Sequence, residues 1–277
     1  MRVGLRVAKR AWVYAAALAL VVFSLLPFYW MVLTSVKPDA EIITATPQFW
    51  PSSFDFSRYA RVIERGFTTE FLNSLRIAAG TIVTGIGLAA FAGYTLARFD
   101  IPLRRYLLLL VMTIQMFPLI VLIIPLYGVF VDLGLLNRWY GLVVLYLAFA
   151  LPLGIYMLRG FFAAIPKDLE EAAMVDGATR MQAIWRVVMP LTGPGLAATS
   201  IFLFLSAWNE FVIALTFTSQ ATSRTLTVGL TQFVGRNATD WGGIMAYSTM
   251  MIIPAIVFFL AVHKRLTSGL VLGATKG

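Results

Sequence analysis

The chain has 277 residues, of which 60% are hydrophobic and only 13% are charged. Its mean hydropathy is +0.83. Soluble domains carry about 25% charged residues, so this chain has too few charges to cover a packed core in water. The composition therefore excludes a soluble globular domain and indicates a surface that faces lipid. The chain has no cysteine and one histidine, His263, which excludes thiolate chemistry and multi-histidine metal sites.

Six apolar runs are long enough to cross a hydrocarbon core of roughly 30 Å. The sequence thus predicts an all-α membrane protein with a six-helix transmembrane domain over residues 12–266 and short tails at 1–11 and 267–277. The first run follows four basic residues as a signal peptide would, but it is too long and lacks a convincing cleavage site, so we interpret it as an uncleaved span. The predicted spans are 12–34, 74–97, 106–130, 139–161, 196–217 and 245–266.

Basic residues predict which side each loop occupies, because cytoplasmic loops of membrane proteins carry an excess of Lys and Arg. With the N-terminus inside, the inner segments hold fourteen basic and five acidic residues, whereas the outer loops hold seven of each. The net charge of +9 therefore lies entirely on the cytoplasmic side. We expect both termini to be cytoplasmic, and the basic balance gives no support for nucleic-acid binding.

The largest inner segment, residues 165–190, has a helical pattern of its own. Pro166 and the acidic residues that follow it suit the first turn of a helix, and Gly177 suits its C-terminal end with a positive φ. A second short amphipathic helix is predicted over Arg180–Val188, ending before Pro190. On its own, this pattern is also typical of a helix pair lying on the membrane surface.

The spacing within this segment is more specific. Glu171-Ala172-Ala173 is followed after three residues by Gly177, after nine more by Val187, and then by Met189-Pro190. This arrangement resembles the EAA signature of permeases of binding-protein-dependent ABC importers, with Val187 and Met189 in place of the usual Ile and Leu. Further matching pieces are Asn73-Ser74, Tyr94–Phe99, Asp176–Ala178, Ala207–Glu210 and the tail Gly269–Gly277.

As a whole, the chain resembles the second permease subunit of carbohydrate importers of the maltose, trehalose and glycerol-3-phosphate type. The resemblance implies a type I ABC importer permease fold with a cytoplasmic coupling helix, in the cytoplasmic (inner) membrane of a bacterium or archaeon. It implies a non-catalytic subunit that binds no cofactor itself, with ATP and Mg held by a partner ATPase. The implied partners are a homologous second permease in a heterodimer, two ATPase subunits, an extracytoplasmic sugar-binding protein and membrane lipid. The residues expected to couple to the ATPase are Glu170, Glu171, Ala172, Ala173, Asp176, Gly177 and Ala178.

Small and polar residues within the spans are candidates for the pathway or for helix contacts. Gly85, Ala89, Gly93 and Ala97 form a small-residue stripe, which serves either static packing or sliding against the partner permease. Asn209 and Glu210 are a polar pair inside the fifth run, where they line the pathway or brace helices. Asn73, at the start of the second run, belongs to the same set of candidates.

The outer segments 37–73 and 218–244 are candidate docking surfaces. The second contains the residues expected to contact a binding protein: Gln220, Arg224, Gln232, Arg236 and Asn237. An autonomous channel or secondary transporter is the alternative hypothesis, but it leaves the EAA spacing unexplained. An intramembrane hydrolase is disfavoured because the sequence has neither an H-E-x-x-H nor a G-x-S-x-G motif.

Overall fold

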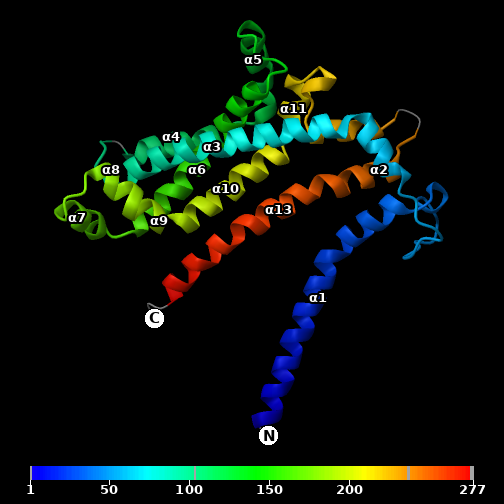
Figure 1. Ribbon diagram of the computed structural model, residues 1–277, viewed down its shortest axis with the longest axis horizontal. Helices are drawn as coiled ribbons and strands as arrows, with labels where there is room; N and C mark the ends of the chain where they lie inside the picture. Colours follow the sequence, from blue (N-terminus) through cyan, green and yellow to red (C-terminus); the bar gives the residue numbers. More distant parts are fainter. Residues whose placement is uncertain (1, 103, 236–237, 275–277) are drawn as a thin grey trace. The chain divides into compact units, whose positions relative to one another are not determined.

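The computed structural model describes residues 2–102, 104–235 and 238–274 (Figure 1). These residues form helices and turns, with one isolated antiparallel bridge between Val234 and Thr239. The prediction of an all-α protein is therefore confirmed. The chain divides into two compact units, one formed by Met1–Phe67 with Leu230–Ile252 and the other by Thr68–Gly229 with Ile253–Gly277.

The first unit is organised around a buried arginine. Its elements are α1 (Arg2–Val36), η1 (Asp39–Glu41), α2 (Ser57–Val62), η2 (Ile63–Phe67), η5 (Leu230–Phe233) and the start of α13 (Trp241–Ala274). Arg58 is only 2% exposed; its guanidinium donates to the carbonyls of Ser35 and Lys37 and pairs with Asp39 at 2.5 Å. A Cβ at Gly242 would lie 2.6 Å from Arg58 Cζ, so the glycine makes room for this side chain.

The core of the second unit is formed by α3 (Thr68–Arg98), α6 (Trp139–Ala164) and α10 (Gly193–Trp208), which pack against one another. A Cβ at Gly85 would lie 2.8 Å from Leu203 Cδ1, and one at Gly93 would lie 3.0 Å from the backbone nitrogen of Arg159. Ala89, between them, is fully buried. These three members of the small-residue stripe thus serve packing within the chain, which is the first of the two roles left open by the sequence.

Among the residues that the structure describes, four helices are long and apolar enough to cross a membrane: Trp12–Val36, Ser57–Arg98, Trp139–Ala164 and Trp241–Leu266. A fifth is obtained if Arg180–Leu191 and Gly193–Trp208, which meet at 73°, count as one span. The run predicted as the third span contains two helices, α4 (Arg104–Ile114) and α5 (Leu119–Asp132), with Pro118 before the second. A proline restricts the preceding residue to extended backbone, which explains the break. The count of six stays a prediction.

The inner segment contains α7 (Lys167–Val175), α8 (Arg180–Ala183), the π-helical turn η3 (Ile184–Val188) and α9 (Met189–Leu191). The sequence-based expectation that the second helix ends before Pro190 is wrong, because helical backbone continues to Leu191. The wider π turn shifts the hydrogen-bond pairing just before Pro190 and so accommodates its missing amide. The chain bends afterwards, at Thr192, whose hydroxyl donates to the Val188 carbonyl at 2.8 Å.

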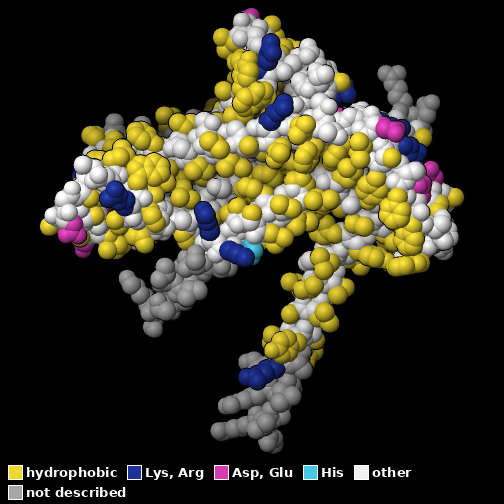
Figure 2. Space-filling view, viewed as in Figure 1, with side chains coloured by type: hydrophobic (Ala, Val, Ile, Leu, Met, Phe, Trp, Pro, Cys, Tyr) yellow, Lys and Arg dark blue, Asp and Glu magenta, His cyan; other side chains and the backbone are white. Residues whose placement is uncertain are grey.

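Hydrophobic side chains cover much of the viewed face of the long helices, and acidic side chains gather at the end where α7 lies (Figure 2). Val83 and Phe91 on α3 are 74% and 76% exposed. Such large apolar exposure is unfavourable in water but favourable in lipid. The surface therefore agrees with the lipid environment that the composition predicts.

Candidate functional site

The helix α7 is closed at its C-terminal end by a Schellman motif. The Ala178 amide donates to the Ala173 carbonyl at 3.0 Å, and the Gly177 amide donates to Met174 at 3.1 Å. Gly177 has a φ of +92°, a conformation that costs residues with a side chain on the order of 1–3 kcal/mol. The prediction of a positive φ at Gly177 is confirmed. The next helix, α8, begins with a capping box in which Thr179 and Gln182 exchange hydrogen bonds.

A buried ion pair anchors α7 to the core. The Glu170 carboxylate pairs with Arg98 Nε at 3.0 Å, with the two side chains only 7% and 6% exposed. It also accepts a hydrogen bond from the Tyr94 hydroxyl. Arg98 donates a second bond, at 3.0 Å, to the carbonyl of Ile165 at the end of α6. Arg98, the last residue of α3, therefore ties α7 and the end of α6 to α3.

Not all of the residues that the sequence predicts to contact the ATPase are exposed to a partner. Glu171, Ala172, Val175, Asp176 and Gly177 are exposed, whereas Ala173 and Ala178 are half-buried and Glu170 is buried. Val175 is 87% exposed. Glu170 thus positions the helix, and Glu171 is the carboxylate that faces outward.

At the opposite end of the core, Glu210 braces helices. Its carboxylate accepts from the amides of Ile213 at 2.8 Å and Ala214 at 2.9 Å, which lie in the first turn of α11 (Val212–Phe217). A carboxylate is stabilising there because it satisfies unpaired amides and faces the positive end of the helix. Asn209 donates back to the Leu205 carbonyl at 3.0 Å. Of the two roles left open for this pair, these contacts favour bracing.

The loop after α11 is held by two asparagines. Asn73 Nδ2 donates to the carbonyls of Thr222 and Arg224, at 2.8 and 3.0 Å. Oδ1 of Asn137 accepts from the amides of Ser219 and Gln220, at 2.7 and 3.0 Å, and from the Ser223 hydroxyl. Sequence reasoning missed Asn137; its signal was an asparagine between two apolar runs, a residue that tolerates the positive φ of 59° observed here.

The residues expected to contact a binding protein are divided between the two units. Gln220 is exposed and Arg224 half-buried on the loop held by the asparagines, in the second unit. Gln232 is exposed and belongs to the first unit. Arg236 and Asn237 lie outside the described residues.

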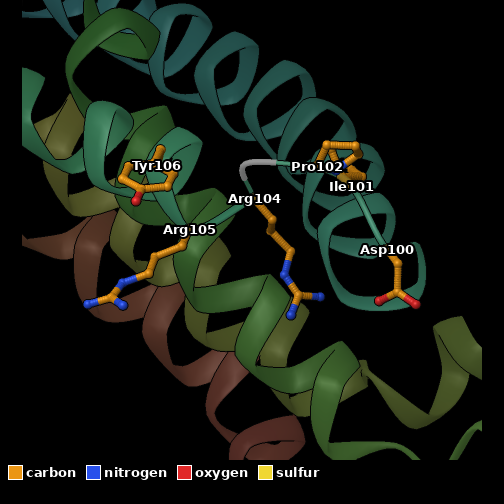
Figure 3. Close-up of a pocket in the computed structure, with 6 residues that line it drawn as sticks. All are labelled: Asp100, Ile101, Pro102, Arg104, Arg105 and Tyr106. Atoms are coloured by element: carbon orange, nitrogen blue, oxygen red, sulfur yellow. The ribbon is translucent and has the colours of Figure 1, made fainter.

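A pocket of about 520 Å³ lies where α3 gives way to α4 (Figure 3). Its charged lining residues are Asp100, Arg104 and Arg105. Figure 3 shows that Arg105 extends away from Arg104 and that Asp100 lies on the other side of Arg104. Because these groups do not converge on one point, the pocket does not have the geometry of a binding site.

Comparison with known proteins decides the family. Residues 81–271 match the family described as binding-protein-dependent transport system inner membrane component. The chain belongs to this family. The permease is 38% identical to the diacetylchitobiose uptake system permease protein DasC of Streptomyces coelicolor over 97% of this chain and 98% of that protein. It is 39% identical to the trehalose transport system permease protein SugB of Mycobacterium tuberculosis, over 98% and 99% of the two chains.

A solved structure supports the fold of the permease. It comes from a bacterial ABC transporter that imports the polysaccharide alginate, and it matches with a TM-score of 0.76 and 26% identity over 93% of this chain and 97% of that chain. The resemblance to ABC importer permeases identified from the sequence is therefore confirmed. The permease is an inner membrane component of such a transporter.

The anchoring role of Glu170 can be tested by removing its charge. Glu170→Gln leaves Arg98 charged and buried without a counter-ion, so we expect a loss of about 3–5 kcal/mol in the free energy of unfolding. Hydrogen exchange in residues 165–178 should rise and thermal unfolding should occur at a lower temperature. The exposed Glu171→Gln is the matched control and should change stability by less than about 0.5 kcal/mol. Equal effects of the two variants would contradict the assignment.

Proposed function

We propose that the permease is one of two homologous subunits that form the translocation pathway of an ATP-driven sugar importer. In this proposal a binding protein delivers the sugar outside, and two ATPase subunits hydrolyse ATP inside. The sugar class is supported by the chitobiose and trehalose permeases, which align over nearly their full lengths. The observation that carries the coupling role is α7, an exposed and capped helix fixed to the core by a buried ion pair.

The mechanism follows from how α7 is attached. A helix that transmits force needs a rigid link to the elements it moves, and Arg98 supplies one by binding both Glu170 and the end of α6. A push on the exposed face of α7 is then passed to α3 and α6 together. Since these helices pack closely through Gly85 and Gly93, the core moves as a body in response. Alternating access thus becomes a consequence of ATPase closure.

The proposed orientation places both termini and α7 in the cytoplasm. The chain has no cysteine of its own, so the labelling of a single introduced cysteine reports only on the position where it was introduced. We expect cysteines at Ser53 and Thr222 to react with an impermeant reagent added outside intact cells, and cysteines at Thr179 and Ser268 to react only after lysis. The reverse pattern would overturn the orientation derived from the basic residues.

The coupling role is tested by two variants on α7 and the turn after it. Gly177→Val meets no atom within 4 Å but places a β-branched residue at φ +92°, a local strain of about 1–3 kcal/mol. Glu171→Lys reverses the outward-facing charge. Both should insert at normal levels, and both should lose sugar uptake in reconstituted vesicles through a detached ATPase or uncoupled hydrolysis.

A matched control separates coupling from general damage. Gly160→Val, on α6, also meets no atom within 4 Å, and Gly160 has no positive φ. It should keep normal uptake. Near wild-type uptake by both α7 variants, with the ATPase retained, would show that α7 is only a surface helix.

The proposed contact with the binding protein is tested through Asn137. Asn137→Gly keeps the positive φ but removes the acceptor of four hydrogen bonds from residues 219–223. If the loosened loop weakens the contact by the equivalent of one net hydrogen bond, about 1 kcal/mol, half-maximal stimulation of ATP hydrolysis should need about fivefold more loaded binding protein. Asn137→Asp retains the acceptor and should behave nearly as wild type. Unchanged stimulation in Asn137→Gly would count against this contact.

A further inference from the structure

An apolar groove of about 780 Å³ runs along the exposed face of α3 and the helices that follow α7. Its volume lies within the roughly 300–1,000 Å³ of ordinary ligand pockets. The lining extends from Val83 on α3 to Phe99, one residue past the end of that helix, a rise of about 24 Å at 1.5 Å per residue. One leaflet of the hydrocarbon core is about 15 Å thick, so the groove is long enough for an acyl chain. A Cβ added at Gly87, in the wall of the groove, would meet no atom within 4 Å.

A smaller, polar pocket shares one lining residue with the groove. This pocket, of about 120 Å³, is lined by Arg98, Lys167, Glu170, Glu171 and Arg180. Arg180 lines both the groove and this pocket, and its guanidinium lies 5.2 Å from the ring centroid of Phe99. Because Glu170 neutralises Arg98, the remaining charges are two cations and one carboxylate, an excess of one positive charge.

An apolar groove with a basic pocket beside it fits an amphiphile with an anionic head. We propose that this surface binds an anionic phospholipid of the adjoining leaflet, with its phosphate at Arg180 and Lys167 and an acyl chain along Gly87 and Phe91. Trp185, also in the lining, is 62% exposed, as expected of an indole at the boundary between lipid and water. The proposal depends on the proposed function in one respect only, namely which leaflet of the membrane supplies the lipid.

Bound lipid here touches both parts of the coupling region. The head would lie beside Glu171 on α7, and the chain would lie against α3, the helix to which α7 is anchored. Anionic lipid would therefore stabilise the position of α7 against α3, because the bound lipid would contact both helices. A neutral lipid lacks the charge that Arg180 and Lys167 recognise.

Native mass spectrometry of the full-length permease within its purified transporter tests the proposal, with phosphatidylglycerol and phosphatidylcholine as probes. Wild type should retain phosphatidylglycerol preferentially. Arg180→Gln should weaken that retention about fivefold, the equivalent of ~1 kcal/mol for a basic residue at a lipid surface. Gly87→Leu should abolish it by filling the groove. The matched controls Arg186→Gln, on the same helical segment, and Gly128→Leu, an equally open glycine on α5, should retain lipid as wild type does.

Equal retention of both lipids, or full retention by Gly87→Leu, would overturn the proposal. So would a cysteine at position 87 that cross-links to the partner permease in a transporter without bound lipid, since that outcome gives the groove to a protein helix. Lipid retention is measured by mass and needs no sugar uptake. The lipid-retention result can therefore be interpreted even if the sugar-import proposal fails.

Discussion

The buried pair between Glu170 and Arg98 is the constraint on which the end of the second unit that holds α7 depends. Two charges at about 6–7% exposure are stable only with close geometry and further hydrogen bonds, and Tyr94 and the Ile165 carbonyl supply those bonds. The pair joins three elements at one point: the end of α3, the end of α6 and the first turns of α7. Loss of one partner leaves the other charge buried, so both partners are needed to hold the three elements together. In the proposed coupling role, this link would pass a displacement of α7 to α3 and α6.

Local sequence predicts where α7 begins and ends, but it does not predict which face of the helix is buried. Pro166 and Gly177 act on their own backbone, so a helix with these limits and the turn after it follow from sequence. The adjacent Glu170 and Glu171 differ only by a rotation of about 100° around the helix, and sequence places no partner beside either. Only the position of Arg98, seventy-two residues earlier, decides which carboxylate is buried. The same limit hid Asn137, whose hydrogen bonds join residues more than eighty positions apart.

Hydropathy predicted where the chain is apolar, but not whether each apolar run is one helix. The runs at 106–130 and 196–217 are both interrupted, the first before Pro118 and the second at Asn209–Phe211. In the second case Glu210 supplies acceptors to the amides that the break exposes, which removes the usual cost of unpaired backbone at membrane depth. The presence of Glu210, a charged residue inside an apolar run, is thus explained by its hydrogen bonds to the amides that the break leaves unpaired. A sliding average of hydropathy does not include such hydrogen bonds and therefore does not predict the break.

The packing of α3 also limits how the permease can move. Gly93 lies against the backbone of α6, and Gly85 lies against side chains of α6 and α10, at distances that leave no room for a methyl group without displacement. Helices in such contact do not slide by fractions of a turn, because each intermediate position overlaps atoms. Gly85, Ala89 and Gly93 of the small-residue stripe are therefore occupied within the chain, which favours static packing over sliding against a second permease. In the proposed mechanism, movement between access states would then occur at the edges of the packed core, where exposed apolar faces meet lipid or another subunit, and α7 would move that core as a whole.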